Sequence, residues 1–131
     1  MTIYKTKVFD RWARNNDLSD LSLCNAVKEM KVGLFDADLG GGLFKKRVAK
    51  SGSGKRGGFR TLLATNRNDK WFFVFGFEKN ARDNIDMVEE KALKKYANEL
   101  LSYTKTSIDK LENDGKIIRI ECHEKEKISD S

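Results

Sequence analysis

The apolar positions near the N-terminus predict one strand followed by two helices. Residues 2–9 are rich in β-branched and aromatic side chains, which favours a strand. Residues 9–16 have apolar side chains at helical spacing, and a second helix follows between Ser19, in the position of an N-cap, and Gly33, in the position that ends a helix. The apolar faces of the two helices are Phe9, Trp12 and Ala13, then Leu23, Ala26, Val27 and Met30.

The period of the pattern changes to two in the middle of the chain. Residues 34–42 include three consecutive glycines and predict a loop. Residues 43–49, 59–67 and 70–80 each predict a strand, with a turn over 66–69, and together they predict an antiparallel meander. The segment 70–80 is the most apolar of the three, so we expect it to be the central strand.

The period returns to 3.6 near Asp86. Apolar residues at helical spacing predict a long helix there, followed by a short helix over 107–113 and a last strand over 117–122. The residues that define the long helix are Ile85, Val88, Ala92, Tyr96 and Leu100. The mixture of a meander with helices before and after it predicts an α+β fold.

Length and composition indicate one small globular domain. The chain has 131 residues, of which 39% are hydrophobic, so it can bury a single core. We expect this domain over residues 1–122 and a frayed polar tail over 123–131. No apolar run approaches the roughly 18 residues that span a membrane, and the N-terminus lacks the apolar segment of a signal peptide. We therefore expect a cytoplasmic protein that does not associate with membranes.

The cysteines and the histidine indicate neither a disulfide framework nor a metal site. Cys24 and Cys122 are far apart in the sequence, and we interpret Cys24 as a small buried apolar residue. His123 is the single histidine of the chain and falls in the polar tail, which disfavours a zinc site or a histidine-based triad. We expect reduced cysteines, no metal and no cofactor.

Positive charge is concentrated in the middle third of the chain. Residues 39–82 carry eleven basic and two acidic side chains, whereas residues 1–38 are neutral and residues 83–131 carry a net charge of −3. Between Asp38 and Asp69 there are eight cations and no carboxylate. A solvated surface is the ordinary explanation for a run of charge. These cations fall in segments predicted as strands, however, where they repel one another, and a polyanionic partner explains them better.

The stretch 50-KSGSGKRGGFR-60 contains the spacing G-x-G-x-x-G, which occurs in loops that bind a nucleotide pyrophosphate. That fingerprint requires its glycines between a strand and the N-terminus of a helix, where free backbone N–H groups hold the phosphates. Here the glycines join two predicted strands. The P-loop pattern also fails, because no Gly-Lys-Ser/Thr occurs. We interpret the stretch as a long basic hairpin loop.

The strands beside this loop place cations on one face of the predicted sheet. The side chains expected to share that face, or to approach it from the end of the central strand, are Lys45, Arg47, Arg60, Lys79 and Arg82. Lys46 alternates to the other face. Such a cluster can hold a phosphodiester and stabilise the charge that builds up during its cleavage, with one lysine as a base near neutral pH. A binding surface without catalysis explains the same residues equally well.

Three segments carry a resemblance to a known family: 36-DADLGGGLFKKRVAKSGSGKRGGFRTLLATNR-67, 72-FFVFGFEKNARDNI-85 and the closing GKIIRIEC. With the order of predicted elements over residues 1–122, they resemble the RelE/ParE superfamily of bacterial type II toxins, and in particular its RelE- or HigB-like toxins. This resemblance implies a RelE-like fold and an mRNA interferase that inhibits translation. Such toxins typically cleave mRNA in the ribosomal A site, without a metal, by attack of a 2′-hydroxyl on the adjacent phosphate.

The resemblance also implies catalytic roles for five residues. Lys45 and Arg47 match two basic residues on a strand of RelE, and Arg60 in Gly-Phe-Arg matches the arginine of its Gly-Tyr-Arg. Lys79 and Arg82 represent its later basic pair, with Asn80 between them where RelE has an arginine.

Two features around this set bear on substrate binding and chemistry. Asp86 occupies the position of the C-terminal catalytic tyrosine of RelE, so the acid–base mechanism does not transfer residue by residue. The residues that we expect to contact RNA beside the catalytic set are Lys46, Lys50, Lys55, Arg56 and Phe59. Of these, Phe59 also suits a place in the core.

A toxin of this type implies a cognate antitoxin, often a helix-turn-helix protein, with mRNA and the ribosome as further partners. Promoter DNA would be bound only through the antitoxin complex. Two other functions stay open at this point. One is a gyrase poison of the ParE branch, which generally lacks the basic catalytic set, and the other is a nucleic-acid-binding module without catalysis.

Overall fold

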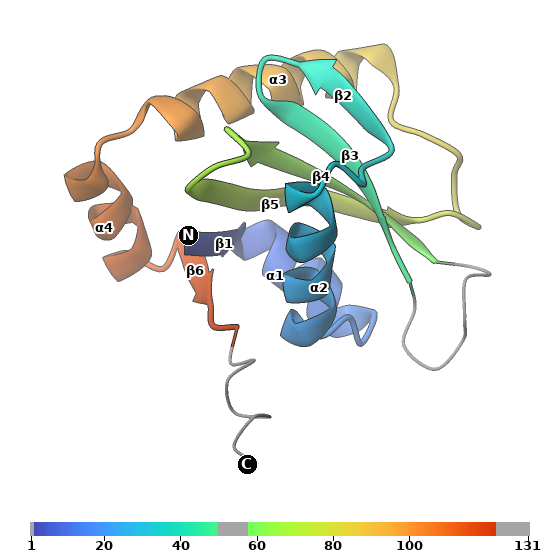
Figure 1. Ribbon diagram of the computed structural model, residues 1–131, viewed down its shortest axis with the longest axis horizontal. Helices are drawn as coiled ribbons and strands as arrows, with labels where there is room; N and C mark the ends of the chain where they lie inside the picture. Colours follow the sequence, from blue (N-terminus) through green and yellow to red (C-terminus); the bar gives the residue numbers. More distant parts are fainter. Residues whose placement is uncertain (1, 50–57, 123–131) are drawn as a thin grey trace.

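The computed structural model describes residues 2–49 and 58–122, and its strands form one six-stranded sheet in the order β2-β3-β4-β5-β1-β6 (Figure 1). The strands are β1 (Thr2–Thr6), β2 (Ala37–Gly40), β3 (Leu43–Val48), β4 (Phe59–Thr65), β5 (Lys70–Glu78) and β6 (Ile117–Ile120). The helices are α1 (Lys7–Asn15), α2 (Asp20–Lys31), α3 (Met87–Ser102) and α4 (Lys105–Asn113). β1 runs parallel to β5, and the other neighbouring strands are antiparallel.

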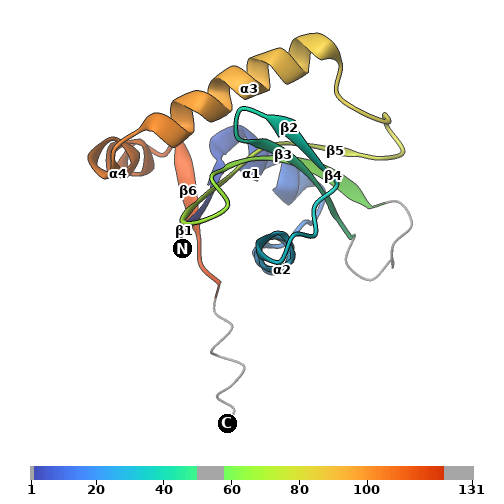
Figure 2. The ribbon, with the colours of Figure 1, turned by 45° about the horizontal axis from the view of Figure 1, so that its top comes forward.

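Helices cover both faces of the sheet. Figure 2 shows α3 above the sheet and α2 below it. α1 and α2 pack on one face through a core that includes Phe9 and Phe73, and α3 and α4 pack on the other through a core that includes Leu100 and Phe72. We call these the α1–α2 face and the α3–α4 face. Because successive strand residues point to opposite faces, this division decides where each cation of β3 and β4 lies.

The structure confirms the α+β fold and most of the predicted elements. The antiparallel meander consists of β3, β4 and β5, and β5 lies inside the sheet. Ser19 caps α2 as predicted, and Gly33 follows the helix with a φ of +91°. The first strand is shorter than predicted, because Thr6 Oγ1 accepts a hydrogen bond from Phe9 N at 3.1 Å and so begins α1.

Residues 37–40, predicted as part of a loop, instead form the edge strand β2. The pairing of β2 with β3 is extended by a hydrogen bond from Asp36 N to Lys45 O at 2.9 Å. The turn between the two strands consists of Gly40, Gly41 and Gly42, which all have a positive φ. This backbone conformation favours glycine, so the glycines that predicted a loop are the residues that close a hairpin.

The long helix α3 packs only partly through the face that its pattern predicts: Leu100 and, just before the helix, Ile85 are buried as expected, but other predicted residues are not. Its buried residues are Ala97 and Leu100, with Leu93 partly buried against the same core. Val88 is 79% exposed and Tyr96 is 36% exposed. α3 therefore carries two neighbouring apolar stripes, and periodicity alone does not show which one packs on the sheet.

The two cysteines form a disulfide, which corrects the expectation of two separate thiols. Cys24 lies in α2 and Cys122 follows β6, and their Cα atoms are 5.8 Å apart across a sequence separation of 98 residues. β6 is antiparallel to β1, so it returns the end of the chain to the α1–α2 face. Only this tertiary arrangement brings the two residues together, which is why their spacing gave no indication of the bond.

Candidate functional site

Two arginines lie directly opposite each other on neighbouring strands of the sheet. In the register of β3 and β4, Arg47 pairs with Arg60 and Lys45 pairs with Leu62. Leu62 belongs to the core under α3 and α4. Because paired residues point to the same side of a sheet, Lys45, Arg47 and Arg60 all lie on the α3–α4 face. We call the surface formed by these three cations the basic face.

A β-bulge in β5 adds two aromatic rings to the same side. β4 and β5 shift register at Val74, which has no partner in β4. Strict alternation from Phe73, on the α1–α2 face, would place Phe75 and Phe77 there too. After the bulge Phe77 instead lies opposite Arg60, and both rings pack against the core under α3 and α4. The bulge therefore gives the basic face an aromatic border.

Arg82 lies over these rings. Its guanidinium carbon is 5.3 Å from the ring centroid of Phe77 and 5.9 Å from that of Phe75. Its Nε donates a hydrogen bond to Asn84 O at 3.2 Å, and the guanidinium forms an ion pair with Glu89 in the first turn of α3. Arg82 is thus fixed beside the basic face with its charge compensated.

Asn84 connects Lys45 to the same corner of the molecule. Lys45 Nζ donates a hydrogen bond to Asn84 Oδ1 at 3.4 Å, and Ile85 N donates to the same oxygen at 2.9 Å. The sequence alone does not identify Asn84, because it lies in an aperiodic segment between β5 and α3. The bulge that reorients Phe75 and Phe77 gives no sequence signal of its own either.

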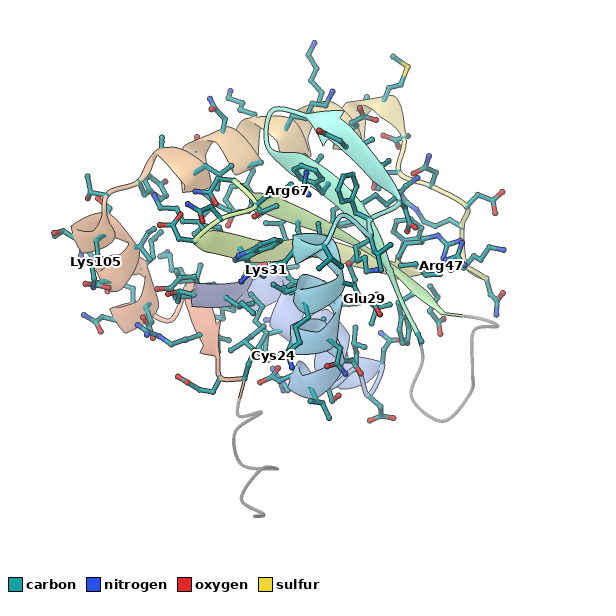
Figure 3. The ribbon with its side chains drawn as sticks, in the orientation of Figure 1. Cys24, Glu29, Lys31, Arg47, Arg67 and Lys105 are labelled. Carbon is teal, nitrogen blue, oxygen red and sulfur yellow. A yellow bond between two sulfur atoms is a disulfide. The ribbon has the colours of Figure 1, made fainter. Side chains whose placement is uncertain are left out.

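The charges of Arg47 and Arg60 have no carboxylate partner among the described residues. Arg47 is exposed and Arg60 is partly exposed, and Lys79, which follows β5, is exposed and likewise unpaired there. Figure 3 shows Arg47 at the end of the molecule opposite Lys105 of α4. Like charges directly opposite each other destabilise a strand pair. A bound anion would remove this repulsion, so the arrangement favours a phosphate ligand.

Two residues expected to contact RNA lie on the α1–α2 face instead. Lys46 is 7% exposed, and its Nζ is 2.5 Å from Glu29 Oε1 of α2. Phe59 is 1% exposed and packs edge-on against Trp12. Both therefore support the layer formed by α1 and α2 and do not reach the basic face. The other residues expected to contact RNA lie outside the described part of the chain: Lys50, Lys55 and Arg56.

Asp86, which we expected at the position of a catalytic tyrosine, is the N-cap residue of α3. Its carboxylate accepts a hydrogen bond from Glu89 N at 2.8 Å, and Glu89 Oε1 accepts one from Asp86 N at 2.9 Å. This reciprocal arrangement is a capping box. Glu89 also pairs with Arg82, so the cap ties the start of α3 to the border of the basic face.

A small α+β domain whose sheet exposes uncompensated cations belongs to the class of proteins suited to bind polyanions. A family model described as the RelE toxin of the RelE/RelB toxin–antitoxin system matches residues 1–120. The chain therefore belongs to the RelE family of toxins, and an antitoxin is its implied partner. No curated protein gives a significant match.

Two general features complete the description of the site and its surroundings. Within residues 2–49 and 58–122, no three histidine, cysteine or acidic side chains gather as a metal site would require. None of the helices in the same residues is long and apolar enough to cross a membrane.

Proposed function

We propose that this toxin is an endoribonuclease that cleaves mRNA on the ribosome and thereby stops translation. The observation that carries the proposal is the pair Arg47 and Arg60, directly opposite each other on the basic face and without a carboxylate partner in the described residues. Membership of the RelE family supports the toxin role. The cytoplasm, where mRNA is translated, is the compartment that this activity requires.

The reaction would be an internal transfer within the RNA backbone. The 2′-hydroxyl loses its proton to a base, and its oxygen attacks the adjacent phosphorus. The bond from phosphorus to the 5′-oxygen breaks, and that oxygen takes up a proton. The products are a 2′,3′-cyclic phosphate and a 5′-hydroxyl end. This chemistry needs an in-line geometry, a proton acceptor, a proton donor and cations on the phosphate.

The basic face, with Lys79 and Arg82 beside it, offers groups for each of these tasks. Arg47 and Arg60 would hold the non-bridging oxygens, which carry the growing charge. Lys45 and Lys79 are the side chains that we propose for proton transfer to and from the RNA oxygens. Arg82, held by Glu89 and the rings beneath it, would bind the neighbouring phosphate of the chain.

The deciding experiment measures whether an mRNA stays intact in a reconstituted translation reaction. We would compare the wild type with Arg60→Gln and with the control Arg11→Gln, each with and without ribosomes, and map the RNA ends by primer extension. Arg11 is exposed on α1, on the other side of the sheet, so the control removes the same charge away from the basic face.

We expect cuts that require ribosomes, persist in Arg11→Gln and decrease at least a hundredfold in Arg60→Gln, a loss of about 2.7 kcal/mol or more in transition-state stabilisation. Cuts on RNA without ribosomes would support the nuclease activity but show that it does not require the ribosome. An intact message with folded protein under all conditions would refute catalysis. A ParE-like action on gyrase or simple RNA binding would then be the functions to test.

A further inference from the structure

A second surface of the molecule combines a hollow shape with exposed apolar side chains. A groove of about 460 Å³ lies between α3 and the edge of the sheet where β1 meets β6. Val74 of β5 forms part of its lining, with Leu93 and Tyr96 of α3 and Val8 of α1. Val8 is 67% exposed although it belongs to this apolar lining.

The exposed stripe of α3 continues from this groove. Val88, Ala92 and Tyr96 are spaced by four residues and so lie on one side of the helix. They flank the face that packs on the sheet, where Ala97 and Leu100 are buried. An exposed apolar stripe that joins a groove is typical of a surface that another protein segment covers.

The rim of the groove carries more positive than negative charge, with four lysines against the carboxylates of Asp114 and of Glu99, which follows Tyr96 on α3 by three residues. Lys7 and Lys116 line the groove, and Lys91 and Lys95 lie beside the stripe on α3. None of these four lysines forms an ion pair within the described residues, whereas Lys94, on the packed side of α3, pairs with Glu90 at 3.1 Å. The groove also has an acidic lining residue, Asp114, whose carboxylate is 3.5 Å from Lys110 Nζ. The lysines therefore suit an occupant with acidic flanks.

We propose that this groove binds an amphipathic segment of the antitoxin, with apolar side chains on Val8, Val74 and Tyr96 and carboxylates against the lysines of the rim. The proposal rests on family membership for the existence of the partner and on the groove for the place where it binds. Neutralising the toxin and catalysing RNA cleavage then use different residues of the α3–α4 face.

The test is a titration of the toxin with its cognate antitoxin, followed by calorimetry. The variant Val8→Asp places a charge in the apolar lining that also repels an acidic segment. Its matched control is Val32→Asp, because Val32 is 75% exposed at the end of α2, away from the groove. A second pair compares Lys7→Glu with Lys31→Glu, an exposed lysine in the last turn of α2.

We expect Val8→Asp and Lys7→Glu each to lower the affinity for the antitoxin at least tenfold. Both controls should bind the antitoxin with an affinity within twofold of the wild type. The loss in Lys7→Glu should shrink as salt is added, because exposed charges are screened. If Val8→Asp and Val32→Asp bind the antitoxin with equal affinity, and circular dichroism shows that both are folded, the proposal is wrong. It is also wrong if the antitoxin does not bind the wild-type toxin.

The same variants separate this proposal from the proposed catalysis. Val8→Asp should cleave mRNA at the wild-type rate, and Arg60→Gln should bind the antitoxin with wild-type affinity. If the wild type cuts no RNA, the nuclease proposal fails while the binding comparison still decides the groove. Loss of antitoxin binding in Arg60→Gln but not in Val8→Asp would place the antitoxin on the basic face and refute the groove.

Discussion

At the scale of single residues, the basic face depends on side chains that do not themselves carry charge. Asn84 accepts a hydrogen bond from Lys45 Nζ and a second one from Ile85 N, and its carbonyl accepts from Arg82 Nε. One residue thus joins two of the five cations that we propose for catalysis. Exposed lysines otherwise sample many rotamers, so this contact reduces the entropy lost when substrate binds.

We expect Asn84→Ala to lower the rate of mRNA cleavage by about three- to tenfold, a change of ~0.7–1.4 kcal/mol in the barrier. The unfolding midpoint should move little, since Asn84 is exposed. Asn80→Ala is the control, because Asn80 is exposed in the neighbouring turn. Steady-state kinetics would check the effect, and a wild-type rate in Asn84→Ala would show that Lys45 needs no such support.

Some of these residue positions could be predicted from the sequence and others could not. Alternation along β3 and β4 was enough to put Lys45, Arg47 and Arg60 on one side, because the period of a strand is fixed by its backbone. The partner of Lys46 is Glu29, which is seventeen positions earlier in α2, and no local rule connects the two. The burial of Phe59 likewise depends on its contact with Trp12 of α1.

At the scale of elements, the start of α3 gives Asp86 a structural role. Asp86 caps the helix, and removing a capping side chain costs about 1 kcal/mol. We expect Asp86→Ala to lower the free energy of unfolding by that amount in urea titrations. Asp86→Ser retains an oxygen in the capping position, so its stability and its cleavage rate should both stay near the wild type. A folded Asp86→Ser protein without activity would instead assign Asp86 a chemical role.

The α1–α2 layer is anchored to β1 by a buried lysine. Lys5 is 7% exposed, and its Nζ is 2.8 Å from an oxygen of Asp10 and 2.7 Å from one of Asp20. Burial acts to raise the pKa of the Asp10 carboxyl, but hydrogen bonds from Lys5 and Arg14 outweigh it and lower that pKa. Burial acts to lower the pKa of Lys5, but the two carboxylates outweigh it and raise that pKa.

The lowered pKa of Asp10 and the raised pKa of Lys5 define the pH range in which this buried ion pair stabilises the fold. The contribution of Asp10 is present above the unfolded carboxyl pKa of about 3.9 and is lost as pH falls through its lowered folded value. The contribution of Lys5 is present below about 10.4 and is lost as pH rises through its raised folded value.

We expect Asp10→Asn to cost about 1.5–3 kcal/mol at neutral pH, the range for hydrogen bonds to charged groups. The variant should also lose less stability than the wild type on acidification below pH ~4, since its side chain no longer titrates. Asp109→Asn breaks an exposed pair with Lys105 and should cost no more than about 0.5 kcal/mol. Urea unfolding over pH provides both comparisons, and equal costs for the two variants would contradict the buried anchor.

Elements with a clear strand or helix period could be predicted from the sequence, and elements whose placement depends on distant contacts could not. β3 and β4 alternate over their full length and a turn at 66–69 separates β4 from the apolar run of β5, so the strands of the meander follow from local pattern, although the bulge at Val74 does not. β2 leads into a turn of glycines, Gly40 to Gly42, that carry no apolar signal, yet this turn lets β2 pair with β3. The face of α3 is set by the strands beneath it, and β6 is placed by its pairing with β1. Those causes act between distant segments.

At the scale of the whole molecule, the two sides of the sheet have separate tasks. The α1–α2 face holds most of the largest buried aromatic rings, the Lys5 anchor and the disulfide. The α3–α4 face carries both the basic face and the groove. Changes confined to the α1–α2 face should therefore affect stability and leave RNA cleavage nearly unchanged, because they do not touch Lys45, Arg47 or Arg60.

The disulfide offers the most direct test of this expectation, because its loss should change stability and not the cleavage rate. It joins α2 to Cys122, two residues beyond β6, so reduction opens a loop of about a hundred residues in the unfolded chain. The chain-entropy estimate for closing such a loop is about 4.7 kcal/mol. We expect a reductant, or the double substitution Cys24→Ala with Cys122→Ala, to lower the free energy of unfolding by about 3–5 kcal/mol.

Urea unfolding with and without reductant would measure the loss, with mass spectrometry of alkylated protein to count free thiols. The reducing cytoplasm keeps most cysteines as thiols, so the toxin proposed here would act there in its less stable form. The cleavage rate of folded, reduced protein should equal that of the oxidised protein, since Arg47 and Arg60 are held by β-pairing and not by the bond. A large fall in the cleavage rate at unchanged secondary structure would show that α2 positions the basic face through Lys46 and Glu29. The expectation that the two faces of the sheet have separate tasks would then be wrong.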